Sequence, residues 1–185
     1  MRFILFFLLV LFPFAARADA VCDDLWFTRN LVMDRGGYCF GSTLGQSVFG
    51  NEGCTGKTAA VSRRDAGLVE RLMAREAEET CQVDTSRPAL DLDDLAVRQR
   101  LVDLPVRDLT DSLCLGWNGP ETPLRAGRSD AAEALGAIAT ADVVRFAHWE
   151  EEGWQYVTVF NSDLSVKAGG WLAPGLDANC TAYAG

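Results

Sequence analysis

Residues 22–40 read CDDLWFTRNLVMDRGGYCF, and this stretch decides how the first half of the chain folds. Asp23 and Asp24 favour a helix start, because acidic side chains cap the first turn and complement the positive end of the helix dipole. Apolar residues follow on two sides of the predicted helix, so we expect much of its surface to be covered. Gly36-Gly37 then ends it, since glycine accepts the left-handed conformation that commonly follows a last turn. The stretch therefore predicts a helix over residues 23–35.

Cys22 and Cys39 flank this helix and are not expected to bond each other. A helix over residues 23–35 is ~20 Å long, whereas bonded cysteines have Cα atoms within ~7 Å. If this helix packs antiparallel to a third predicted helix over residues 64–79, Cys22 meets Cys81, which leaves Cys39 with Cys54. Without that packing, the pairing among these four cysteines stays open. A third bridge, Cys114 to Cys180, is expected to join the ends of the second half of the chain.

The first 20 residues have the layout of a secretory signal peptide. Arg2 precedes an apolar run from Phe3 to Phe12, and small residues then offer cuts after Ala18 or Ala20. The run is shorter than the ~20 residues that a membrane-spanning helix needs. All six cysteines follow it, and an even number of exported cysteines predicts disulfides formed in the periplasm or the medium. We expect no membrane anchor after cleavage.

The charge and the cysteine spacing argue against several classes of function. The chain has 17 basic and 26 acidic residues, and removing Arg2 and Arg17 with the signal leaves 15 cations, a net charge of −11. Such a surface repels nucleic acids and anionic membranes. The chain has no C-x-x-C pair and a single histidine, His148, so a zinc or redox site has little support. We predict no metal site and no cofactor.

The patterns change along the chain from helical to β. A short amphipathic segment, residues 44–49, and the helix over 64–79 follow the first helix. From Leu113 onward, short alternating segments separated by Gly, Pro and Asn are typical of strands. Residues 83–112 between them predict a polar linker, including Asp91 to Asp94, with a short helix that ends before Pro105.

The sequence thus predicts an α+β protein of two small disulfide-stapled domains. Domains of this size bury only ~60% of the surface of the unfolded chain, so covalent staples are expected. After the signal peptide, 1–20, the predicted parts are a helical domain over 21–82, the linker over 83–112 and a small β-barrel over 113–185.

The first half resembles the YARHG family of extracytoplasmic bacterial domains, in which an R-N helix leads to an R-H-G-Y-x-F turn. It resembles still more closely a cysteine-bearing, uncharacterised proteobacterial relative with C-x-x-L-W, R-N, G-Y-C-F and F-G-N-x-G-C blocks. The blocks of this chain are Cys22 to Trp26, Arg29-Asn30, Gly37 to Phe40 and Phe49 to Cys54. Gly36 stands where the YARHG motif has its histidine. The resemblance implies a cell-envelope role.

The motif residues Arg29, Asn30, Gly37, Tyr38 and Phe40 have a structural interpretation. Arg29 is expected to donate to carbonyl groups at the turn, and Asn30 to bond the backbone beside it. Such bonds hold an irregular turn in one shape. The alternative is a ligand-binding cluster of Arg29, Asn30 and Tyr38 beside an open cleft.

The second half resembles a bacterial SH3-like domain over residues 113–176. The resemblance rests on the order of four short blocks, namely Leu124 to Asp130, Leu135 to Val144, Gly153 to Val157 and Gly170 to Leu172. It implies a small barrel of the kind that often binds peptidoglycan or peptides. Fold alone does not determine function, so the type of ligand is inferred here only by analogy with other SH3-like domains.

Aromatic residues are the candidate binding groups of the second half. Trp154 and Trp171 hold core-type positions, whereas Trp149, at a strand end, and Tyr156 are the candidates for contact with a ligand. His148 is interpreted as a solvated residue at a turn rim, and no nucleophile motif accompanies it. We therefore predict a secreted, non-catalytic envelope module that binds peptidoglycan or a protein partner. The alternative is an envelope hydrolase or an inhibitor of one.

Overall fold

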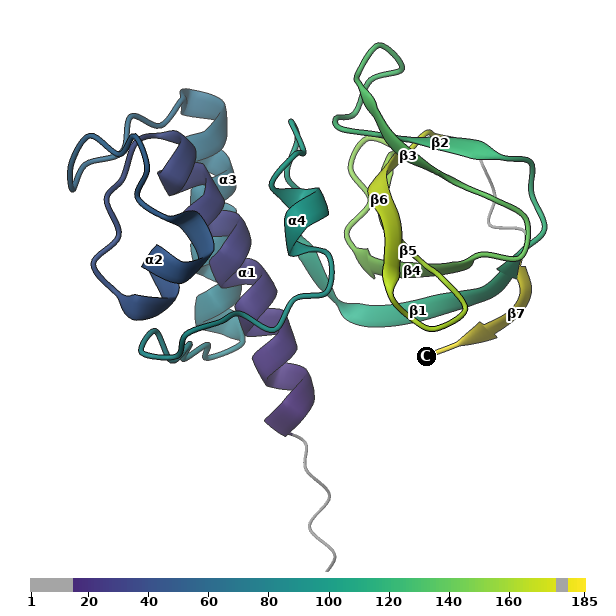
Figure 1. Cartoon of the computed structure of the whole chain (residues 1–185), viewed down its shortest axis with the longest axis horizontal. Helices are drawn as coiled ribbons and strands as arrows, with labels where there is room; N and C mark the ends of the chain where they lie inside the picture. The colour runs from purple at the N-terminus through teal and green to yellow at the C-terminus, as the bar shows by residue number, and fades with distance from the viewer. Residues whose placement is uncertain (1–14, 176–179) are drawn as a thin grey trace, which may run out of the picture.

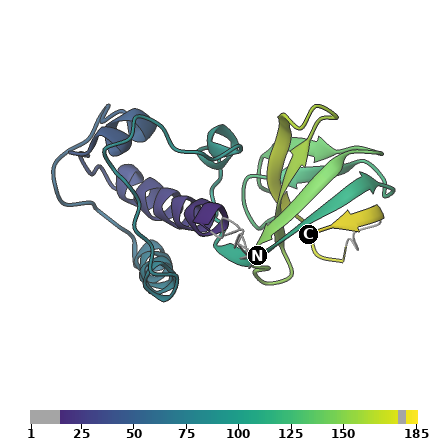
Figure 2. The ribbon, with the colours of Figure 1, turned by 90° about the horizontal axis from the view of Figure 1, so that it is seen from below.

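The structure is a computed structural model and describes residues 15–175 and 180–185. A group of helices lies beside a curved antiparallel sheet, with a short helix between them (Figure 1). The view from below shows the same two parts side by side (Figure 2). The charged start and apolar run of the predicted signal peptide lie outside the described residues. No helix within the described part is both long and apolar enough to cross a membrane.

The three predicted helices of the first half are confirmed. They are α1 (Ala15–Arg35), α2 (Thr43–Phe49) and α3 (Arg63–Glu78). Gly37 follows α1 with φ 82°, the left-handed conformation expected there. The predicted start of α1 is wrong, because the helix begins at Ala15 and passes through both predicted cut sites. Asp24 is therefore inside the helix and buried, where Arg98, from the segment predicted as linker, compensates for its burial.

All three predicted disulfides form. Cys22 bonds Cys81, Cys39 bonds Cys54, and Cys114 bonds Cys180, with Cα–Cα distances of 5.3, 5.1 and 5.3 Å. The first bridge joins α1 to the chain just after α3, as the antiparallel packing of these helices requires.

The second half forms one seven-stranded antiparallel sheet in the order β3-β2-β6-β5-β4-β1-β7. Ahead of it, α4 (Leu95–Arg98) confirms the short helix predicted in the linker. The strands are β1 (Arg107–Trp117), β2 (Thr122–Arg125), β3 (Ala134–Ile138), β4 (Val143–His148), β5 (Gln155–Phe160), β6 (Val166–Leu172) and β7 (Cys180–Ala184).

The sheet is curved but not closed, so the predicted SH3-like barrel is not confirmed. Both edges of β1 are occupied, one by β4 and the other by β7. β3, at the opposite end of the sheet, therefore does not pair with β1 or β7. β1 also begins at Arg107, inside the segment predicted as linker.

One hydrophobic cluster extends across both halves of the chain. Trp26, Phe27 and Leu31 of α1 belong to the same buried group as Trp154 and Trp171 of the sheet part. The two tryptophans predicted as core residues are indeed buried. The predicted domain boundaries at residues 82 and 113 stay a prediction. The helical part and the sheet part share a common hydrophobic core, so the linker is not their only connection.

Candidate functional site

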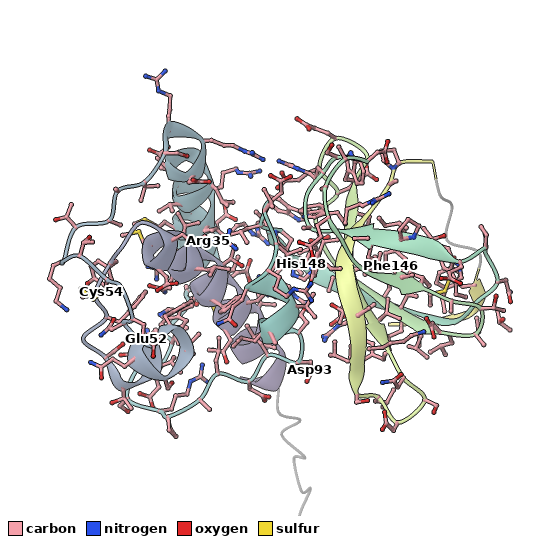
Figure 3. The ribbon with its side chains drawn as sticks, turned by 45° about the horizontal axis from the view of Figure 1, so that its top comes forward. Arg35, Glu52, Cys54, Asp93, Phe146 and His148 are labelled. Atoms are coloured by element: carbon pink, nitrogen blue, oxygen red, sulfur yellow. A yellow bond between two sulfur atoms is a disulfide. The ribbon has the colours of Figure 1, made fainter. Side chains whose placement is uncertain are left out.

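Three charged or titratable side chains meet where the helices contact the sheet. Asp24 of α1 lies with one carboxylate oxygen, Oδ2, 2.7 Å from Nη1 of Arg98 in α4 and 3.1 Å from Nε2 of His148 in β4. Figure 3 shows His148 at the junction of the two parts. The Arg98 and Asp24 side chains are only 1% and 5% exposed. We call Asp24, Arg98 and His148 the buried triad.

Further polar side chains connect the triad to α1 and β5. Arg98 donates to the hydroxyl of Thr28, which itself donates to the carbonyl oxygen of Asp24 at 3.0 Å. Beside them, Asp94 accepts hydrogen bonds from Tyr156 at 2.9 Å and from Thr158 at 2.8 Å. Buried polar groups that are bonded in this way fix the relative position of the elements that carry them.

The electrostatics of the triad set its charge states. Burial acts to raise the pKa of Asp24, but the Arg98 guanidinium and His148 outweigh it and hold this pKa well below its usual range. Burial likewise acts to lower the pKa of Arg98, and Asp24 and Asp94 outweigh it and raise this pKa. Burial lowers the pKa of His148. At neutral pH the triad is therefore an Asp24–Arg98 ion pair beside a neutral imidazole.

The burial of His148 predicts a loss of stability as the pH falls below ~6.5, the usual histidine pKa. The pKa is lowered in the folded state, so the unfolded chain takes up the proton first and the free energy of unfolding decreases. Asp24, with its depressed pKa, adds a further loss only below ~3.9. Urea unfolding at pH 7.5 and 5.5 measures the histidine effect. His148 is the only histidine, so His148→Gln should remove most of the difference, and an unchanged difference in that variant contradicts the assignment.

A pocket of about 220 Å³ opens beside the triad, between the start of α1, the segment before α4 and the sheet. We call it the interface pocket; its lining includes Asp24, Asp91, Asp93, Asp94, Arg107, Arg145 and His148. Figure 3 shows Asp93 near this junction. Asp91 and Asp93 are exposed at its rim, whereas Asp24, Asp94 and Arg107 are buried.

Two buried atoms of the pocket lining have no hydrogen-bond partner among the described residues. One is an acceptor, Oδ1 of Asp24, and the other is a donor, Nε of Arg107. The Arg107 side chain is 8% exposed, and its Nη2 donates to Asp111 at 2.9 Å. Leaving a buried polar group unpaired costs ~1–3 kcal/mol. The lining residues therefore include one acceptor and one donor for which the protein supplies no hydrogen bond.

Among the described residues, the lining offers no hydroxyl or thiol group that is free to act as a nucleophile. Its hydroxyl group, on Thr158, donates to Asp94, and Nε2 of His148 faces Asp24. Within the described residues, no group of three or more Asp, Glu, His or Cys side chains is arranged to hold a metal ion. What the pocket offers is charge and unsatisfied hydrogen-bonding groups.

A second pocket, of about 230 Å³, lies toward the other end of α1. Arg35, labelled in Figure 3, lines it, together with Arg64, Arg71 and Arg128. Arg64 pairs with Asp103, whereas Arg71 and Arg128 both pair with Glu151. Arg64, Arg71 and Arg128 therefore form ion pairs between segments that are distant in the sequence.

The structure places the predicted aromatic candidates in packed positions. Tyr156 is fully buried, with its ring 4.9 Å from that of His148. Trp149 is half-buried, packs beside Val21 and Leu72, and lies 5.2 Å from the Arg75 guanidinium. Tyr156 therefore has no face open to a ligand, whereas Trp149 is only partly covered. The prediction of a solvated His148 is wrong, because α1 covers the strand end that carries it.

The motif residues lie apart from the interface pocket. Arg29 does not donate to the turn as predicted; it donates to both carboxylate oxygens of Glu76 in α3 at 3.0 Å. Asn30 does bond the backbone, donating to the Trp26 carbonyl at 2.7 Å. At Gly37, an added Cβ would lie 2.7 Å from the Thr55 hydroxyl oxygen.

The aromatic residues of the motif pack locally. Tyr38 contacts Phe40 edge to face, with ring centroids 5.1 Å apart, and Lys57 lies over the Tyr38 ring. These contacts fit the structural interpretation of the motif, in which it orders the turn after α1.

Sequence reasoning missed Asp24, Asp94, Arg98, Arg107 and Arg145 as members of one site. A signal for Arg98 was present: it stands three residues after Leu95 and three before Leu101, on the apolar side of the short helix. An arginine at such a position is buried only when it is paired. The sequence does not name the partner, which comes from α1.

Comparison with known proteins divides the chain near residue 80. Residues 9–76 match the model of the YARHG domain, in agreement with the resemblance of the first half. Residues 80–185 match the model of a domain of unknown function, DUF4453, and this match does not confirm the SH3-like resemblance. Neither a curated protein nor a solved structure matches the chain.

The second match begins before α4 and includes α4 together with the entire sheet, so one family model spans Asp94, Arg98 and His148. Because it covers more than half of the sequence, the chain belongs to the DUF4453 family and carries a YARHG domain ahead of it.

Proposed function

We propose that the protein is an exported, non-catalytic module of the bacterial cell envelope that binds peptidoglycan through the interface pocket. Export is supported by the signal-like start of the sequence and by the three disulfides, which persist in oxidising compartments. The YARHG domain also fits an extracytoplasmic location.

The observation that carries the proposal is the pair of unpartnered groups in the interface pocket, Oδ1 of Asp24 and Nε of Arg107. Both belong to side chains that ion pairs and burial hold in place, so a ligand meets groups that are already ordered. Preordered groups strengthen binding because little entropy is lost on association. The small volume of the pocket favours a charged end group of a polymer over an extended protein segment.

The alternative, a hydrolase, needs a base with access to a nucleophile. His148 is buried, and its Nε2 faces the Asp24 carboxylate and not a hydroxyl or thiol group that it could activate. The geometry therefore gives no support to a hydrolase that depends on His148.

Replacing both rim carboxylates, Asp91→Asn with Asp93→Asn, is expected to reduce sedimentation with purified peptidoglycan sacculi. The change removes two exposed negative charges from the pocket and, with Asp93, the partner of a largely exposed 3.8 Å ion pair with Arg145. We expect roughly tenfold weaker binding, from ~1.4 kcal/mol of lost charge-assisted interaction. The matched control is Glu121→Gln with Asp130→Asn, which removes two exposed carboxylates outside the pocket and should leave binding unchanged.

Equal losses in the pocket and control variants would show a nonspecific charge effect and contradict the proposal. Absence of sedimentation by the unmodified protein, together with capture of a specific envelope protein, would replace peptidoglycan by a protein partner. Muramidase or amidase turnover abolished by one carboxylate substitution would instead identify the hydrolase.

A further inference from the structure

We propose that the interface pocket recognises a free α-amino-acid end, in which an ammonium and a carboxylate group stand on one carbon atom. Peptidoglycan stem peptides that contain diaminopimelate carry such an end, so this inference rests on the proposed function and names the chemical group that the pocket binds.

The ammonium group is matched by carboxylate oxygens of the pocket lining that are exposed or have no hydrogen-bond partner within the protein. Arg98 neutralises Asp24 through Oδ2, but the other oxygen, Oδ1, has no hydrogen-bond partner although the side chain is only 5% exposed. Asp91 and Asp93 add two exposed carboxylates at the rim, and Asp93 lies 3.8 Å from Nη1 of Arg145 in a largely exposed ion pair. An ammonium group carries three donors and no acceptor, and a ring of carboxylate oxygens satisfies such a group.

The carboxylate group is matched by Arg107. Its guanidinium is held by Asp111, which also accepts a hydrogen bond from Nε of Arg145 at 2.9 Å. Nε of Arg107 remains unpartnered and belongs to a side chain that is 8% exposed. Guanidinium groups bind carboxylates with strong, directional, charge-assisted hydrogen bonds. Asp111 thus orients two arginines of the pocket lining, and Nε of Arg107 is left without a partner inside the protein.

The size of the pocket limits the ligand to an end group. Its volume of about 220 Å³ is below the ~300–1,000 Å³ of sites that enclose a drug-sized molecule. A single amino-acid end fits this description, and the remainder of the polymer would lie outside the pocket.

Isothermal titration of the oxidised protein with three peptides tests the inference. The first is N-acetyl-L-Ala-γ-D-Glu-meso-diaminopimelate, which has a free α-amino-acid end. In the second, the free amine of diaminopimelate is acetylated. In the third, lysine replaces diaminopimelate, which keeps the side-chain ammonium and removes the carboxylate beside it. We expect each change to weaken binding about tenfold or more, because each removes one charge-assisted contact.

Two variants assign the two contacts. Asp93→Asn should weaken binding of the diaminopimelate peptide about tenfold and leave the affinity for the acetylated peptide unchanged. Arg107→Lys keeps the charge but removes the Nε donor, so it should abolish the preference for diaminopimelate over lysine. The thermal midpoint of each variant, with Asp130→Asn as the control, shows that the fold is retained.

The outcomes separate this inference from the proposed function. Equal affinity for all three peptides, with sedimentation on sacculi still reduced by the rim variants, overturns the α-amino-acid end and leaves peptidoglycan binding standing. If the unmodified protein neither binds the peptides nor sediments with sacculi, the α-amino-acid end and peptidoglycan binding are both overturned.

Discussion

Replacing Arg98 by methionine is expected to reduce the free energy of unfolding by about 3–5 kcal/mol, the cost of leaving one charge of a buried ion pair without its partner. Arg98 is fully buried, pairs with Asp24, donates to Thr28 and lies with its guanidinium 5.0 Å from the Phe27 ring. Methionine preserves much of the apolar contact and removes the charge. Urea unfolding of the oxidised protein at pH 7.5 measures the change.

Arg100→Met is the matched control, because Arg100 lies two residues further on and its side chain is 57% exposed in a 3.5 Å pair with Glu133. Exposed pairs contribute ~0–1 kcal/mol. The double variant Asp24→Leu with Arg98→Met removes both charges and should recover much of the loss. If Arg98→Met unfolds no more easily than Arg100→Met, the triad does not join the two parts.

The elements that could be predicted depend on local patterns. Gly36-Gly37 indicates a helix end from local sequence alone. The helix between Cys22 and Cys39 is too long for these two cysteines to form a disulfide. The correct bridges then followed from the antiparallel packing of two helices. The closure of the sheet could not be predicted in this way, because it depends on whether β7 pairs with the free edge of β1, and short alternating strands do not encode that choice.

The candidate site could not be predicted because its members come from four separate segments. Asp24 resembles a helix cap, Asp94 belongs to an acidic linker, and His148 precedes the acidic run Glu150 to Glu152, so each has an ordinary surface interpretation. Their burial arises only when α1 and α4 pack against β4 and β5. A polar residue in isolation does not identify the partner that makes its burial tolerable.

Trp171→Ala is expected to destabilise the protein by about 3–5 kcal/mol, as removal of a fully buried large aromatic side chain does. Trp171 packs edge to face with Tyr156 at 6.0 Å, and its Nε1 donates to the Asp103 carbonyl at 2.8 Å. It also stands opposite Arg125 where β6 pairs with β2. The substitution therefore weakens three contacts at once, namely the packing of the shared core, the hydrogen bond to the segment after α4 and the pairing of β6 with β2. Thermal and urea unfolding of the oxidised protein measure the loss.

Trp171→Phe separates packing from hydrogen bonding. Phenylalanine keeps most of the ring contact and leaves the Asp103 carbonyl without its donor, so we expect a cost nearer 1–3 kcal/mol. Trp149→Ala gives the comparison with a half-buried tryptophan, whose ring packs at the side of the core under Arg75. The expected order of destabilisation is Trp171→Ala, then Trp171→Phe and Trp149→Ala. If Trp149→Ala were instead the most damaging, the helices would be held to the sheet mainly beside Trp149 and not through the core around Trp171.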